Sequence, residues 1–129
     1  MAEVQVSVDT EKNLTVFIFR GAISFNEVIL LQQEFYANLP TPCVLVDFTE
    51  AFLTDVTTEN LKKVLDVARS KADVRRGGKT AMVFSSDFSV FSFEVGRMYE
   101  IKGELSKLPF TIGSFKTKDE ALKWLSLTE

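Results

Sequence analysis

Two short, continuous apolar runs constrain the fold of this chain more than any other feature. Residues 43–48 read CVLVDF and residues 80–84 read TAMVF, and both are rich in apolar side chains with few interruptions. Such runs are typical of inner strands that are covered on both faces. Between them, residues 57–74 predict a helix with apolar side chains on one face. A strand, a helix and a further strand in this order predict a parallel pair with a right-handed crossover.

The segments on either side extend this pattern. Val4, Val6 and Val8 alternate with polar residues, which is typical of a strand with one face in water. A turn-prone stretch and the β-branched run 14–19 follow, so the two segments predict a hairpin. Further elements are expected at 25–38 (helix), 89–105 (helix), 110–115 (strand) and beyond residue 117 (helix).

Helix boundaries carry local signals. Ser24 with Glu27, and Thr117 with Glu120, have the spacing of capping boxes, so helices are expected to begin directly after Ser24 and Thr117. Gly77 stands where the second helix must have ended. The expected fold is therefore α/β. Residues 1–129 form a single domain with an open mixed sheet in the order ββαβαβαβα, an N-terminal antiparallel hairpin and about four flanking helices.

Composition narrows the class of partner. The chain carries 15 basic and 18 acidic residues, a net charge of −3, which argues against non-specific nucleic-acid binding. Its one cysteine, Cys43, cannot form an internal disulfide and suits a reducing compartment. No apolar run approaches the roughly 20 residues that span a bilayer, and the N-terminus lacks a signal-peptide core. We therefore expect a cytoplasmic protein with no transmembrane segment.

Gly78, Lys79 and Thr80 match the last three positions of a phosphate-binding P-loop. A P-loop also needs a glycine five positions earlier, where this chain has Asp73, and it needs a strand before it and a helix after it. Here a helix precedes and a strand follows, so no helix N-terminus is available to the anion. The sequence predicts no nucleotide site.

Catalytic chemistry has few candidates. The chain has no histidine, which removes the usual general base and the commonest zinc ligand. Asp47 with Glu50 or Asp55 could act as paired carboxylates, although a solvated loop after a strand explains them better. We expect no enzyme activity, no cofactor and no metal, with an enzyme that uses carboxylates or hydroxyls as the weakest alternative.

The first candidate site follows the strand at 43–48. Its members are expected at the start of the second helix: Asp55, Thr57, Thr58, Glu59 and Asn60. Thr57 fits a capping hydroxyl. Alternatively Thr57 or Thr58 is a phosphorylation switch, because a phosphate there meets the positive helix end, although Asp55 and Glu59 oppose it.

The second candidate site lies in the aromatic stretch FSSDFSVFSFEVGRMY, residues 84–99. Its candidate members are Phe88, Phe91, Phe93, Met98 and Tyr99. A wide apolar helix of this kind indicates either an interface, an apolar ligand groove, or simply a deeply buried helix.

A basic cluster lies around the second helix and the turn after it. Its members are Lys62, Lys63, Arg69, Lys71, Arg75, Arg76 and Lys79. The pattern favours the solvated face of that helix, and attraction of an anionic partner is the alternative.

Several motifs together resemble one family. VLVDFTEA followed by a threonine-rich helix start, RRGGKTAMVFSSD, GRMYE and the closing PFTIGSFKTKDEALKWL resemble the SpoIIAA-like branch of STAS domains, related to bacterial anti-sigma factor antagonists. The resemblance implies a non-enzymatic regulatory role with a protein partner. In the antagonists an Asp-Ser-Ser-Gly motif opens the second helix, whereas this chain has Asp55-Val56-Thr57-Thr58 there.

The same branch is similar in fold to Sec14-type lipid carriers. This similarity supports a second hypothesis, in which the aromatic helix covers a small apolar ligand such as a lipid. A homodimer through exposed apolar surface is also possible.

Overall fold

The computed structural model describes residues 3–38, 41–54, 57–70, 75–84, 101, 108 and 110–126. These residues contain one five-stranded sheet, whose strands lie side by side in chain order from β1 to β5. The strands are β1 (Glu3–Asp9), β2 (Leu14–Ser24), β3 (Cys43–Thr54), β4 (Lys79–Val83) and β5 (Thr111–Phe115). The helices are α1 (Phe25–Ala37), α2 (Thr58–Ser70) and α4 (Lys118–Ser126).

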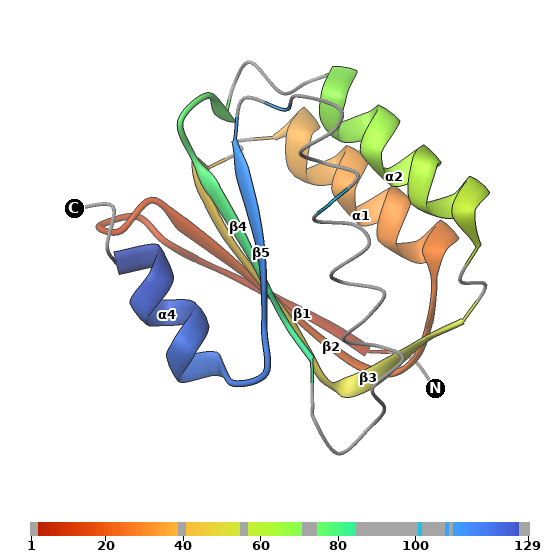
Figure 1. The fold of residues 1–129 in the computed structure, drawn as a ribbon, viewed down its shortest axis with the longest axis horizontal. Helices are drawn as coiled ribbons and strands as arrows, with labels where there is room; N and C mark the ends of the chain where they lie inside the picture. The colour runs from red at the N-terminus through yellow and green to blue at the C-terminus, as the bar shows by residue number, and fades with distance from the viewer. Residues whose placement is uncertain are drawn as a thin grey trace.

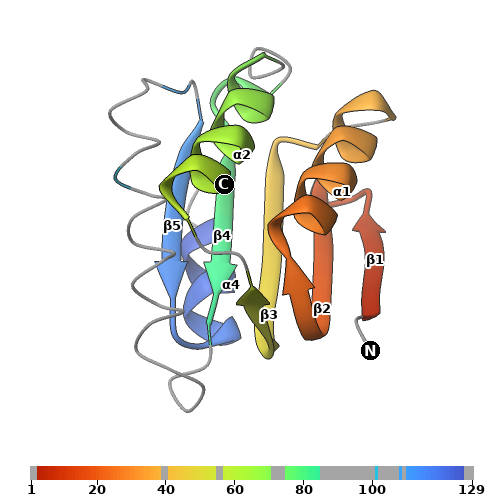
Figure 2. The same ribbon diagram turned by 90° about the vertical axis from the view of Figure 1, so that its right-hand side faces the viewer.

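The sheet is mixed, as the sequence predicts. β1 runs antiparallel to β2, and β2, β3, β4 and β5 pair in parallel. α1 and α2 cover one face of the sheet and α4 lies on the other (Figure 1). Seen from the side of the first two helices, α1 lies in front of β2 and α2 in front of β4 (Figure 2). The open mixed α/β fold is confirmed. The predicted helix at 89–105 lies outside the described residues, except for Ile101, which is helical.

Both predicted capping boxes lie at helix starts. The backbone N–H of Glu27 donates to Ser24 Oγ at 3.2 Å, and α1 begins at Phe25 as expected. Thr117 Oγ1 accepts from the Glu120 N–H at 3.2 Å and lies 3.0 Å from Glu120 Oε1. Each threonine or serine oxygen satisfies one of the backbone donors that a helix leaves unpaired in its first turn.

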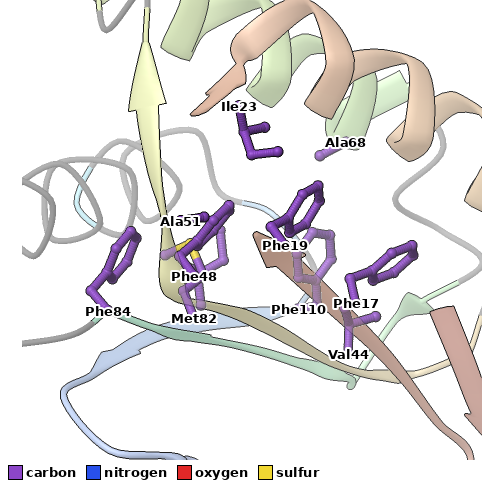
Figure 3. Packing of buried hydrophobic residues seen from close by; sticks show 11 residues of the cluster. Phe17, Phe19, Ile23, Val44, Phe48, Ala51, Ala68, Met82, Phe84 and Phe110 are labelled. Atoms are coloured by element: carbon purple, nitrogen blue, oxygen red, sulfur yellow. The ribbon is translucent and has the colours of Figure 1, made fainter. Parts of the chain in front are cut away.

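The larger core lies between the sheet and the layer of α1 and α2 (Figure 3). Phe48 stacks on Phe19 with ring centroids 5.0 Å apart, and on Phe84 at 5.2 Å. This row of rings crosses β2, β3 and the end of β4, so it ties the centre of the sheet together. Burying one such side chain contributes roughly 1.5–3 kcal/mol.

A smaller core lies beneath α4. Ala121 and Leu125 of the helix pack on buried residues of β2, β3 and β4, which are Leu14, Leu45, Ala81 and Val83. Trp124 lies beside Phe115 with ring centroids 5.3 Å apart. The inner strands β3 and β4 are therefore covered on both faces, which confirms the meaning of their continuous apolar runs.

Two strand predictions need correction. Val4, Val6 and Val8 were expected to face a core, but every residue of β1 is exposed. α1 lies mainly over β2 (Figure 2), so the side chains on that face of β1 stay exposed. β3 was expected to end at Phe48, but it continues to Thr54 alongside a longer β2. After an irregularity at Phe48 and Thr49, residues 50–54 are therefore paired strand and not loop.

The prediction that the basic cluster lies on the solvated face of the second helix is also partly wrong. Arg75 is 3% exposed and lies inside the molecule, where it donates to the backbone carbonyls of Thr41, Pro42 and Lys79. Lys79 donates to the carbonyl of Trp124 at 3.2 Å, near the C-terminal end of α4, with its Nζ 4.7 Å from the indole centroid. Both residues are therefore structural, and they leave the solvated face with fewer cations than the sequence indicated.

Candidate interaction site at the start of α2

The starts of α1 and α2 lie at the same edge of the sheet. β2 and β3 pair in parallel up to Ser24 opposite Thr54, and each strand is followed by its helix. This is the carboxyl edge of the parallel strands, where open α/β sheets commonly place their functional loops. The first predicted site lies at this edge.

Thr57 caps α2. Its Oγ1 accepts the backbone N–H of Asn60 at 3.0 Å, and the residue is exposed. The capping role predicted for this hydroxyl is confirmed. An N-cap oxygen in this position stabilises the helix by about 1 kcal/mol. The exposed residue lies beside the positive end of the helix dipole, where an added negative charge is favoured.

The neighbouring predicted residues share this helix start. Glu59 is exposed and forms a surface ion pair with Lys63 at 3.7 Å, one turn along the helix. Asn60 is half-buried, and Thr58 is the first residue of α2. Asp55 lies outside the described residues. Thr57, Glu59 and Asn60 therefore form the described part of the site.

Of the carboxylates considered for acid–base chemistry, Asp47 and Glu50 lie among the described residues, and both take part in structural contacts. Asp47 was predicted in a solvated loop, but it is 8% exposed and accepts from Thr49 N at 2.8 Å and from Thr49 Oγ1 at 2.7 Å. These bonds hold the irregularity where the pairing of β2 and β3 shifts between Ile18 and Arg20. A bulge leaves a backbone N–H without a partner in the neighbouring strand, and an unpaired buried donor is destabilising. The buried carboxylate therefore stabilises the bulge by accepting the N–H of Thr49.

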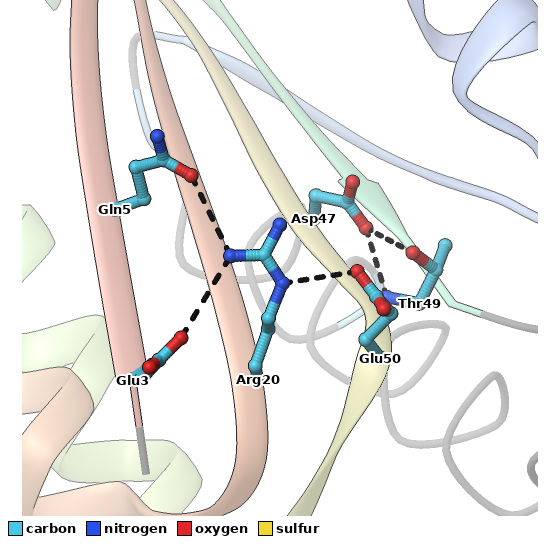
Figure 4. A network of polar contacts seen from close by, with 6 residues as sticks. All are labelled: Glu3, Gln5, Arg20, Asp47, Thr49 and Glu50. Carbon is cyan, nitrogen blue, oxygen red and sulfur yellow. Dashed lines mark hydrogen bonds and ion pairs between the residues drawn. The ribbon is translucent and has the colours of Figure 1, made fainter.

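Glu50 belongs to a second polar network, which no sequence motif indicated (Figure 4). Arg20 of β2 donates through Nε to Glu50 Oε2 at 3.1 Å on β3, and its Nη1 lies 3.5 Å from Gln5 Oε1 and 3.9 Å from Glu3 Oε2 on β1. The side chains are exposed, so each pair contributes little on its own. The available signal was limited to Glu3 and Gln5 at alternate positions of β1, because β2 and β3 each contribute one residue to the network.

Other chemical sites have little support in the described part of the chain. Within it, no three His, Cys, Asp or Glu side chains lie close enough together to hold a metal ion. None of the helices described is long and apolar enough to cross a membrane. Phe88, Phe91, Phe93, Met98 and Tyr99 lie outside the described residues, so the apolar-ligand site stays a prediction.

Comparisons with known proteins show the fold. The chain matches an anti-sigma factor antagonist from Mycobacterium paratuberculosis with a TM-score of 0.57 and 17% identity, covering 98% of this chain and 95% of that one. An uncharacterized protein of the DUF3478 family from Shewanella loihica, with a SpoIIAA-like fold, matches with a TM-score of 0.56, 16% identity and coverages of 96% and 93%.

The antagonist SpoIIAA in its unphosphorylated form matches with a TM-score of 0.54, 13% identity and coverages of 96% and 98%. No family model and no curated protein sequence matches the chain. The chain therefore has a SpoIIAA-like fold, which confirms the resemblance found in its motifs at the level of fold. The similarity to Sec14-type carriers stays a prediction.

Proposed function

We propose that this chain is a non-enzymatic regulatory module that binds a protein partner through the start of α2. The observation that carries the proposal is the exposed Thr57 hydroxyl, which caps α2 at the carboxyl edge of the parallel strands. The described neighbours Glu59 and Asn60 surround it, and we expect Asp55 and Thr58 to belong to the same surface. The fold of anti-sigma factor antagonists supports this role.

Thr57 is also the residue through which such a module would be regulated. One of the similar structures is SpoIIAA of Bacillus in its phosphorylated form, with a TM-score of 0.55 and 14% identity, covering 95% of this chain and 98% of that one. A phosphate on Thr57 would add a charge of about −1.5 to −2 at pH 7 beside the positive end of α2. Glu59 would repel it, so the modification changes the charge of the surface more than it stabilises the helix.

Thr57→Ala tests the proposal. The variant loses the oxygen that accepts the Asn60 N–H, and we expect the free energy of unfolding to fall by about 1 kcal/mol. We also expect partner recovery to be lost when the purified chain is used as bait and the captured proteins are quantified. Thr57→Ser retains the capping oxygen and should retain both stability and binding.

Thr117→Ala is the matched control. Thr117 caps α4 with the same geometry, 3.2 Å from the Glu120 N–H, but α4 lies on the opposite face of the sheet (Figure 1). The control should lose a similar amount of stability and keep the partner. Equal recovery by Thr57→Ala and Thr117→Ala would contradict the proposed binding surface, since it would show that the start of α2 contributes nothing specific.

A further inference from the structure

β1 forms an outer edge of the sheet with unusual exposure. Val4, Val6 and Val8 are 37%, 51% and 56% exposed, and no strand among the described residues pairs with the other side of β1. The three valines lie on the same face as Phe17 and Phe19 of β2, since directly paired residues share a face. β1 therefore continues the apolar face of the sheet beyond the limit of the core.

The backbone of β1 presents hydrogen-bonding groups at this edge. Cys43 N donates to Asn13 O at 3.2 Å, so alternate residues from Asn13 onward direct their backbone groups toward β3. Leu14 and Val16 then direct theirs toward β1, where Asp9 and Ser7 lie opposite them. The intervening Val4, Val6 and Val8 consequently direct their N–H and C=O groups outward, in an open row.

Most of the usual protections of an edge strand are missing from β1, whose two charged residues, Glu3 and Asp9, lie at its ends. Natural edges carry proline, lysine, a bulge or very short length, each of which prevents another chain from pairing. Residues 3–9 contain no proline, lysine or arginine, and their pairing with β2 is regular over seven residues. A regular edge at which the valines direct their backbone N–H and C=O groups outward is suited to pairing with a further strand.

We propose that β1 pairs with β1 of a second copy of this chain, antiparallel and around a two-fold axis perpendicular to the sheet. This arrangement joins two five-stranded sheets into one continuous sheet of ten strands. Both copies then present their valines on the same face, because the axis leaves each face on its own side. The inference is independent of the α2 surface, which lies at a different edge of the molecule.

The charges of β1 disfavour one of the possible registers and are compatible with a second copy as the partner. An axis at Val6 would place Glu3 directly opposite Asp9 of the other copy, at both ends of the pair, which is destabilising. An axis at Gln5 instead places Glu3 opposite Ser7, and Val4 opposite Val6, with the two Gln5 side chains facing each other. β1 is therefore self-complementary in the register centred on Gln5.

The helices leave room for this assembly. α1 lies over β2 (Figure 2), so the two α1 helices of the dimer would be three strand spacings apart. At about 4.8 Å per spacing this is roughly 14 Å, which exceeds the 8–10 Å at which helices pack and avoids a clash. The valines of both copies would lie between the two helices.

Sedimentation over a concentration series tests the proposal. We expect the wild-type chain to change from monomer to dimer as concentration rises, with weak affinity, because the contact is smaller than a standard interface. Val6→Lys should raise the dissociation constant by about tenfold or more, since it places two cations close together at the paired edge. Its circular dichroism and melting temperature should stay near those of the wild type, because Val6 is exposed.

Leu30→Lys is the matched control, because Leu30 is 57% exposed on α1 and lies off the sheet edge. It should dimerise like the wild type. A wild type that stays monomeric at every concentration, or a Val6→Lys variant that dimerises equally well, would overturn the proposal.

A cysteine cross-link tests the register. Gln5 directs its backbone toward β2, so the two Gln5 residues would form a non-hydrogen-bonded pair with Cα atoms about 4.5 Å apart, within the range that a disulfide spans. In a Cys43→Ser background, Gln5→Cys should oxidise to a covalent dimer faster than Ser7→Cys or Val6→Cys. Preferential cross-linking of Ser7→Cys or Val6→Cys would overturn the register.

Discussion

Arg75→Ala is expected to lower the free energy of unfolding by about 3–5 kcal/mol. The guanidinium is buried, donates to the carbonyls of Thr41, Pro42 and Lys79 at 3.0–3.1 Å, and lies 4.2 Å from the ring centroid of Phe110. The variant removes the guanidinium donor from all three carbonyls, although the Pro42 carbonyl keeps its bond from the Lys79 N–H, and it opens a cavity beside the ring. Urea denaturation followed by circular dichroism measures the loss.

Arg69→Ala is the matched control for this substitution. Arg69 lies on the exposed face of α2 and meets Asp66 at 3.4 Å, so its removal should cost less than about 0.5 kcal/mol. Arg75→Lys retains the charge but has fewer donors and no planar group to lie over Phe110, so its stability should fall between the two. Equal denaturation midpoints for Arg75→Lys and Arg69→Ala would contradict the structural role, even if Arg75→Ala failed to fold.

Several helices and strands of this fold could be predicted from residues that are close together in the sequence. Ser24 and Thr117 precede their helices by one position, and the N–H of the third helical residue reaches each hydroxyl. The apolar runs of β3 and β4 needed no tertiary information, because burial on both faces requires continuous apolar residues. Such signals depend on neighbours within a few positions, so a single sequence contains them.

Features that depend on distant neighbours could not be predicted in this way. Arg75 looks like one member of a solvated cation cluster, and only the approach of the segment at Thr41 and Pro42 makes it a buried donor. Asp47 looks like a loop residue, but its bonds to Thr49 let β3 pass a bulge and continue to Thr54. In both cases a polar residue was assigned to solvent because its partner is set by the tertiary fold.

The candidate site likewise has one feature that local sequence predicts and others that depend on distant residues or on a partner. The capping hydroxyl of Thr57 was predictable, since it depends on a residue three positions away. Its position at the same edge as the start of α1 depends on the parallel register that sets Ser24 opposite Thr54. Which partner recognises the surface depends on a molecule outside the chain, which no pattern within these residues specifies.

Gly78→Ala is expected to cost about 3 kcal/mol of folding stability. A Cβ at this position would overlap the Pro42 carbonyl oxygen and would lie 2.8 Å from the Pro42 carbonyl carbon and 3.0 Å from Arg75 O. These are backbone atoms, so they cannot rotate away. The same Pro42 carbonyl accepts Lys79 N at 2.9 Å and Arg75 Nη2 at 3.0 Å, so displacing it also disturbs the start of β4 and the buried guanidinium. Thermal and urea denaturation measure the effect.

Gly77→Ala separates this steric effect from backbone strain. Gly77 has φ of +81°, and a Cβ there would meet nothing within 4 Å. Its substitution should therefore cost only the roughly 1–2 kcal/mol of placing an L-residue in the left-handed region. If Gly78→Ala proved no more destabilising than Gly77→Ala, the close packing of the Gly78 turn against Pro42 would be wrong. The two glycines, which the sequence predicts as the end of the second helix and a turn, would then be needed for that turn alone.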